Sequence, residues 1–347
     1  VGYLQSRYVP LSRQKSLPPF PGTAYFSTQI FHLKILVLTA ALCLSLLTAA
    51  QTTEAYYDFY WKPCEPSLAR YYSTVQKTDS GWLRHDYFVT GPTLQMRALY
   101  ADKDCKIKNG HAAYYYANGQ LQAAGRYQNN KLQGVYLRYH SNGMMADSAS
   151  FRDDVPTGSR ILWHRSGYMS DSIYRISDSV QIHVQWFEDG KLAAAGYLLH
   201  QEPYGKWRYH HRNGSIAGEV VYKEGEVISA AYFHEDGSPQ PDTASANAAA
   251  RFKKGGTDGW KKYVEKNLFW PHGLRLANTT QVTVGVEFYI SPEGKITDAE
   301  ITVPFHPEFD RIALNTIRNS PDWLPAIQHN RKVLQRFRQS VTFLQEE

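Results

Sequence analysis

The sequence predicts a mainly β protein, in which an antiparallel meander of β-hairpin repeats is followed by a small α+β domain of order α-β-β-α-β. Three observations support this fold class. Aromatic residues make up 14% of the chain, with 25 tyrosines, and such residues favour strands. A turn motif that ends in glycine recurs at nearly constant spacing through the middle of the chain. After residue 259 the pattern changes to amphipathic helices that alternate with strands.

The repeat is marked by six glycines at spacings of 24, 24, 23, 24 and 23 residues. Each glycine follows Asn, Ser or Asp, and a ring side chain stands four residues before it. Asn-Gly and Asp-Gly are strong hairpin signals, for which we expect positive φ at both turn positions. Six units of this period predict stacked hairpins of two strands each. The glycines are Gly119, Gly143, Gly167, Gly190, Gly214 and Gly237, with a looser seventh unit around Gly91.

A histidine occupies the position three residues before the glycine in four of the six units. The other two units carry Tyr116 and Phe187 there, so the position accepts any ring. Occupied positions in neighbouring units should stand about 10 Å apart, two strand spacings, whereas Zn–N bonds are about 2 Å. We therefore predict ring packing and no metal site. The histidines are His140, His164, His211 and His234.

The chain divides into five parts by these patterns. Residues 1–50 read as a leader with a signal peptide or membrane anchor, and residues 51–81 lead into the repeats. The repeats cover residues 82–239. Residues 240–259 are rich in Pro, Ser, Ala and Gly and predict a linker. Residues 260–347 form the carboxy-terminal domain.

The apolar run Ile35–Ala50 follows Lys34 and ends in small residues, which is the order of a secretory signal. We expect cleavage between Ala50 and Gln51. The run has 16 residues, and a membrane span needs about 20. A retained membrane anchor is the second interpretation, and a buried core helix is the third.

The net charge of +6 does not indicate a nucleic-acid partner. Four of these positive charges lie in the first 50 residues, which contain no acid, so the remainder carries only +2. There, basic residues are scattered among acidic ones, which is typical of a solvated surface. The four residues are Arg7, Arg13, Lys15 and Lys34.

Two cysteines, Cys64 and Cys105, follow the apolar run. In an exported chain they either pair in a disulfide, which would contribute about 3–4 kcal/mol, or remain as two buried thiols. Two cysteines alone do not make a four-ligand zinc site.

The tail contains the elements of a small α+β domain. A helix begins at Trp260 and stops before Pro271, and the alternating strand Val282–Ile290 is joined by a turn to the strand Ile296–Val303. A second helix follows, with Phe309, Ile312, Ala313 and Ile317 on one side. The last strand is predicted over Lys332–Leu344 and carries Val333, Phe337, Val341 and Phe343 on its inward face.

The segment Trp260–Phe343 resembles the TonB carboxy-terminal domain. The phrases that carry this are "FWP", "VTVGVEFYISPEGKITDAEI", "HPEFDRIALNTIRNSPDWLPA" and "VTF". Trp270 stands where the family usually has Tyr before Pro, which keeps a ring. The repeats resemble the MORN-like repeats of the YwqK antitoxin family. Together with the segment after residue 51, the chain is similar to exported proteins of Bacteroidetes-type bacteria that join such repeats to a TonB tail.

The TonB resemblance implies binding by β-strand addition, in which the last strand pairs with an extended peptide of an outer-membrane TonB-dependent receptor. Arg336 and Arg338 would point away from the core, where they either orient an acidic partner or only solvate an edge strand. The edge residues implied are Arg336, Phe337, Arg338, Gln339, Ser340 and Val341.

No catalytic motif is present: the chain lacks a Gly-Xaa-Ser-Xaa-Gly elbow, a His-Glu-Xaa-Xaa-His motif and a P-loop. We therefore expect neither an enzyme nor a cofactor or small-molecule substrate. The first hypothesis is a periplasmic energy transducer or accessory in outer-membrane transport, coupled to inner-membrane motor proteins. A periplasmic scaffold without motor coupling and a YwqK-like antitoxin or immunity module are the alternatives.

Two features bear on motor coupling. Known family members carry a His in the membrane helix, and Ile35–Ala50 contains none. A long Pro-rich rod is also missing, although about 12 strands at 4.8 Å would span on the order of 60 Å in its place.

Overall fold

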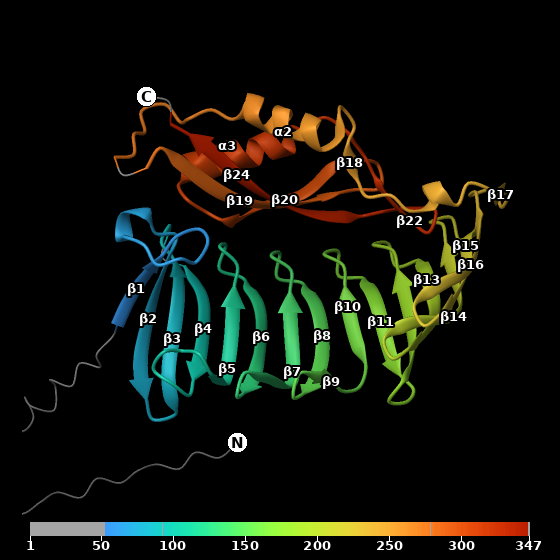
Figure 1. The fold of residues 1–347 in the computed structure, drawn as a ribbon, viewed down its shortest axis with the longest axis horizontal. Coiled ribbons are helices and arrows are strands. Elements are labelled where there is room, and N and C mark those ends of the chain that lie inside the picture. The colour runs from blue at the N-terminus through green and yellow to red at the C-terminus, as the bar shows by residue number, and fades with distance from the viewer. Residues whose placement is uncertain (1–52, 92, 278, 346–347) are drawn as a thin grey trace, which may run out of the picture. The chain divides into compact units, whose positions relative to one another are not determined.

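A single antiparallel sheet of 17 strands dominates the computed structural model, which describes residues 53–91, 93–277 and 279–345 (Figure 1). The expected cleavage site at Ala50 and Gln51 and the apolar run before it lie outside the described residues. The strands are β1 (Thr53–Tyr57), β2 (Tyr71–Thr78), β3 (Gly81–Phe88), β4 (Leu94–Tyr100), β5 (Lys108–Tyr115), β6 (Leu121–Gln128), β7 (Lys131–Tyr139), β8 (Met145–Arg152), β9 (Val155–Pro156), β10 (Arg160–Trp163), β11 (Met169–Arg175), β12 (Val180–Trp186), β13 (Leu192–Leu199), β14 (Glu202–His210), β15 (Ile216–Lys223), β16 (Glu226–Phe233) and β17 (Pro239–Gln240).

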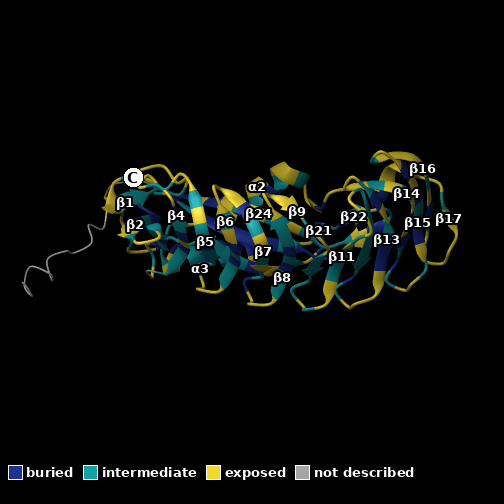
Figure 2. Cartoon of the chain, turned by 90° about the horizontal axis from the view of Figure 1, so that it is seen from below, coloured by how far each residue is buried: buried dark blue, intermediate teal, exposed yellow. Residues whose placement is uncertain are grey.

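The strands follow one another in chain order, as the repeat predicts. Each strand from β1 to β8 pairs with the next, as does each strand from β10 to β17. β8 also pairs with β10, while the short β9 pairs back onto β8. Many connecting turns are exposed, and buried residues lie within the strands (Figure 2). The predicted fold class, a hairpin meander before a small α+β domain, is confirmed.

The glycine turns differ from the prediction in one respect. All six repeat glycines have positive φ, from 81° to 93°, but the residues before them do not. The register shifts beside the ring residue at five of these turns, as at Tyr114/Tyr115, so each is a three-residue loop with a glycine bulge. The expectation of two positive φ angles is wrong here. It holds at the opposite ends of the hairpins, as at Asn129 (49°) and Asn130 (67°).

Side chains next to the glycine turns join each repeat to the following one. The Tyr116 hydroxyl donates to the backbone oxygen of Tyr139 at 2.9 Å. The Nε2 atoms of His140, His164 and His211 contact the backbone oxygen of the ring residue that stands four positions before the glycine of the next repeat, at 2.7–2.8 Å. These histidines therefore hold the stack together, and among the described residues no group of three His, Cys, Asp or Glu side chains is arranged to bind a metal.

The carboxy-terminal domain packs two helices on a three-stranded sheet. The order of strands is β20-β19-β24, and β19 carries five core residues that are at most 1% exposed. The five are Val282, Val284, Val286, Phe288 and Ile290. The main elements are α2 (Gly256–Asn267), β19 (Gln281–Ile290), β20 (Ile296–Val303), α3 (Pro307–Arg318) and β24 (Gln335–Leu344), and the short strands are β18 (Arg251–Phe252), β21 (Trp323–Leu324), β22 (Ala326–Gln328) and β23 (Arg331–Val333).

The last predicted strand is divided in two. The residues before Leu334 belong to β23, which folds back on β22, and those after it form β24. β23 is paired back onto β22 by the tight turn before it, in which His329 (48°) and Asn330 (61°) both have positive φ. Lys332 therefore does not extend the edge strand.

The segment predicted as a linker, 240–259, is structured. It contains the 3₁₀ turn Ala244–Ala246, β18 and the beginning of α2. Ala246, Ala250 and Phe252 are buried, and Ala248 forms two 2.8 Å backbone hydrogen bonds with Ile327. Small residues favour a flexible chain, but they also allow close packing, which composition alone does not distinguish.

The glycine-turn ends of successive repeats contact the carboxy-terminal domain. The Thr90 hydroxyl donates to the Phe305 oxygen at 2.6 Å, near β20. Ser141 donates to Glu300 of β20, and Arg165 lies 3.5 Å from the same carboxylate. These contacts join the repeats and the tail within one compact unit.

Candidate functional site

β24 is an open edge of the tail sheet. It pairs with β19 over ten residues, from Gln281↔Leu344 to Ile290↔Gln335, and no strand within the described ranges pairs with its other side. An open edge presents unpaired backbone N–H and C=O groups that an extended peptide can use. The structure thus gives the predicted edge residues 336–341 a common position on one strand.

The hydrogen-bond pattern shows which residues of β24 face outward. The amide of Gln345 donates to the Thr280 oxygen at 2.7 Å, one step beyond the ladder. Since bonded and non-bonded pairs alternate in an antiparallel ladder, the odd-numbered residues of β24 bond to β19 and the even-numbered ones point their backbone groups away. The Ser340 backbone oxygen supports this assignment, because it accepts a hydrogen bond from the Gln339 side chain at 2.9 Å. The outward residues are Arg336, Arg338, Ser340, Thr342 and Leu344.

The side chains of β24 alternate between two environments. Val341 is fully buried on the helix side, and Phe337 stacks on Phe288 with ring centroids 5.6 Å apart. On the same side, Gln339 accepts a hydrogen bond from the Trp260 indole at 3.1 Å. Arg336, Arg338 and Ser340 are exposed on the opposite side of the sheet. The side chains on the helix side therefore pack against the core, and those on the opposite side of the sheet are available for contact.

Glu287 of β19 lies between the two arginines. Arg338 Nε is 2.7 Å from one carboxylate oxygen, and Arg336 Nη1 is 4.0 Å from the other. The hydrogen bond to Glu287 raises the pKa of Arg338. The Glu287 side chain is 9% exposed, whereas Arg336 and Arg338 remain 47% and 67% exposed. One buried acid faces two accessible cations, so this face of the edge stays positive.

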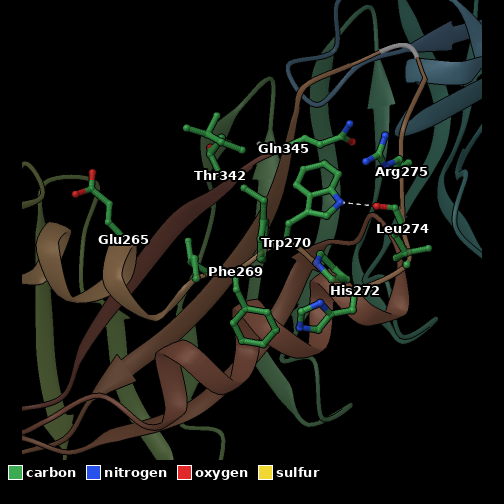
Figure 3. Close-up of a pocket in the computed structure, with 13 residues that line it drawn as sticks. Glu265, Phe269, Trp270, His272, Leu274, Arg275, Thr342 and Gln345 are labelled. Atoms are coloured by element: carbon green, nitrogen blue, oxygen red, sulfur yellow. Dashed lines mark hydrogen bonds between the residues drawn. The ribbon is translucent and has the colours of Figure 1, made fainter. Parts of the chain in front are cut away.

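A groove of about 800 Å³ lies beside the carboxy-terminal half of β24 (Figure 3). Its walls include Phe269, Trp270, Thr342 and Leu344, of which Phe269 is 54% and Leu344 67% exposed. Trp270 is held by a hydrogen bond from its indole to the Leu274 oxygen at 2.7 Å. The groove therefore offers apolar surface next to the outward backbone groups of β24. From the sequence, "FWP" marked the end of a helix and supported the TonB resemblance, but the exposed Phe269 ring was not identified as part of a binding site.

A second contact with the repeats is made by the turn between β22 and β23. The His329 ring stacks on Tyr209 at 3.8 Å, and buried Arg331 donates to the Ala193 oxygen at 2.6 Å. Burial lowers the pKa of Arg331 to about 10. Burial, together with the nearby Arg331, also lowers the pKa of His329 to about 4.

Acidification should weaken this contact. The folded pKa of His329 lies below its ordinary value of 6.5, so the folded state binds its proton less well than the unfolded state. The stabilisation is complete above about pH 6.5 and is lost as the pH falls towards 4. We expect His329→Phe, which keeps the stack, to remove about 1–2 kcal/mol of this pH dependence after allowance for solvent screening. Urea unfolding at pH 7.5 and 4.5 measures it. Identical pH slopes for both proteins would contradict this assignment.

The two cysteines are free thiols, and both are partly buried. Burial raises the pKa of each thiol, which keeps it protonated and unreactive near neutral pH.

Comparison with known families identifies both halves of the fold. Residues 275–344 match the Gram-negative bacterial TonB protein C-terminal family, and residues 108–129 and 203–224 match the MORN repeat variant. The tail is therefore a TonB carboxy-terminal domain, and the sheet before it consists of MORN-like repeats.

The chain thus carries a TonB carboxy-terminal domain. Such a domain indicates a periplasm-facing protein that interacts with receptors. Curated proteins give no match to the chain. Within the described part, no helix is both long and apolar enough to cross a membrane.

Proposed function

We propose that this chain is an energy transducer or accessory in outer-membrane transport, and that it binds receptor peptides by strand addition at β24. The observation that carries the proposal is the open edge of β24, with five outward backbone positions, of which Thr342 and Leu344 border a partly apolar groove. In this proposal the chain acts by binding other proteins and not as an enzyme. It acts in the periplasm, exported by a signal peptide or anchored in the inner membrane.

The repeats favour a second candidate, a periplasmic scaffold without motor coupling. Several repeat turns contact the tail, as at Thr90 and Ser141. A transducer needs a domain that reaches the receptor while its other end meets a motor, and a tail fixed along the repeats suits a scaffold equally well. The two candidates share the peptide site and differ in whether a motor protein binds.

Proline at Arg338 tests strand addition. Arg338→Pro removes an outward N–H, and an edge strand tolerates proline at such a position. We expect residues 51–347 with this change to bind fluorescent amino-terminal peptides of outer-membrane receptors from the same genome about tenfold more weakly or worse. Arg338→Gln, which keeps the N–H, should lose less.

Circular dichroism and the unfolding midpoint must show that the Arg338→Pro protein is folded. If the folded variant binds as well as the wild type, strand addition at this edge is refuted. If no receptor peptide binds the wild type, the scaffold without receptor binding becomes the better proposal.

A further inference from the structure

The repeat sheet lies opposite the exposed side of the strand-addition site. A cavity of about 360 Å³ separates the two, and residues of both line it. Tyr116, Gln122 and Arg138 come from the repeats, and Glu287, Arg336 and Arg338 come from the tail sheet. The peptide edge therefore has a neighbour that the TonB domain alone does not supply.

A strand added to β24 would place side chains in this cavity. Successive side chains of a strand point to opposite faces of its sheet, and directly opposed residues of neighbouring strands share a face. Every second side chain of the bound peptide would then stand beside Arg336, Arg338 or Ser340 and face the repeats. The remaining side chains would lie on the helix side, near Gln339.

The charges that line the cavity determine which peptide side chains it would favour. Its lining contains three arginines and one acid. The acid, Glu287, is already bound by Arg338. Arg138 is 46% exposed, and its nearest acid, Asp147, lies 3.8 Å away and is bound more closely by Arg160 at 2.5 Å. Positive charge that no acid neutralises therefore remains on both walls of the cavity, the repeat sheet and the tail sheet.

We propose that the repeat sheet forms the second wall of the peptide site and that Arg138 selects peptides with an Asp or Glu facing it. This rests on the proposed strand addition. The repeats thereby take part in choosing the receptor, in addition to carrying the tail.

The test compares peptides and variants in pairs. Each receptor peptide is made with acidic residues at alternate positions and again with the amide residues Asn or Gln there. The preference is the ratio of the two dissociation constants, measured with wild type, Arg138→Gln and the control Arg126→Gln. Arg126 is an exposed arginine of β6 that does not line the cavity. We expect the wild type to prefer the acidic peptide about three- to fivefold, and only Arg138→Gln to lose this preference.

The outcomes separate this inference from the proposed function. If amide and acidic peptides bind wild type equally, or if Arg138→Gln keeps the preference, the repeats do not select the peptide, although strand addition stands. If no peptide binds at all, both fail. Should Arg138→Gln prove unfolded, Arg138→Glu provides the second variant and should reverse the preference towards lysine-containing peptides. A folded Arg138→Glu protein that still prefers acidic peptides would overturn the inference.

Discussion

Replacement of Trp323 by alanine should lower the free energy of unfolding by about 3–5 kcal/mol. The side chain is 5% exposed in the centre of an aromatic cluster. Its ring centroid lies 5.0 Å from that of Trp260 and 5.2 Å from that of Phe337, so it contacts rings of both α2 and the edge strand β24. Its indole also donates to the Ser320 hydroxyl at 3.2 Å. Alanine would leave a large cavity beneath the peptide site.

Urea unfolding followed by circular dichroism measures this loss, and Trp323→Phe is the matched control. Phenylalanine keeps most of the ring contacts and gives up only the indole N–H and part of the volume, so we expect it to lose less than half as much. A loss below about 1 kcal/mol for Trp323→Ala would mean that the cluster collapses around the gap without cost, contrary to the packing described.

Gly294→Ala should also be strongly destabilising, by about 3–5 kcal/mol. Gly294 has φ of +78°, and an added Cβ would collide with the backbone oxygen of Trp323. The same contact includes a 2.8 Å hydrogen bond from the Trp323 amide to the Gly294 oxygen. The turn would have to move away from Trp323, and that hydrogen bond would be lost.

Gly237 offers a closely matched control because it occupies the same kind of turn. Its φ is +84°, its amide bonds to the residue three positions earlier at 2.9 Å as in Gly294, and an added Cβ would meet nothing within 4 Å. Gly237→Ala should therefore cost only the backbone strain, about 1–2 kcal/mol. Equal losses at the two sites would show that the contact with Trp323 contributes nothing.

Sequence reasoning was most effective where the signal was local. The spacing of the glycines predicted the hairpins, because one turn and two strands repeat within 23 or 24 residues. The alternation in β19 predicted its buried face in the same way. The kind of turn was harder to predict, because Asn-Gly suits both a two-residue loop and a bulged three-residue loop.

Contacts between distant segments could not be predicted. Arg338 meets Glu287 only because of the register between β24 and β19, which no short pattern specifies. The insertion of His329 against Tyr209 depends on how the tail packs on the repeats, and the groove at Phe269 depends on where the chain passes after α2. The alternation of the last strand predicted its inward face, and the TonB resemblance predicted its role as a binding edge. Which backbone groups point outward follows only from the hydrogen bonds of the folded chain.

The contacts between the repeat turns and the tail limit how many repeats can lie along the TonB domain. The tail touches the repeats at points as far apart in the chain as Thr90 and Phe233. Each repeat adds two strands, or about 10 Å, along the sheet. An extra repeat inserted between Thr90 and Phe233 would move these two contact points apart by the width of one repeat. Deletion of a repeat would bring them too close together to fit the tail. Homologous chains that keep both contacts should therefore vary in length outside this span, and not within it.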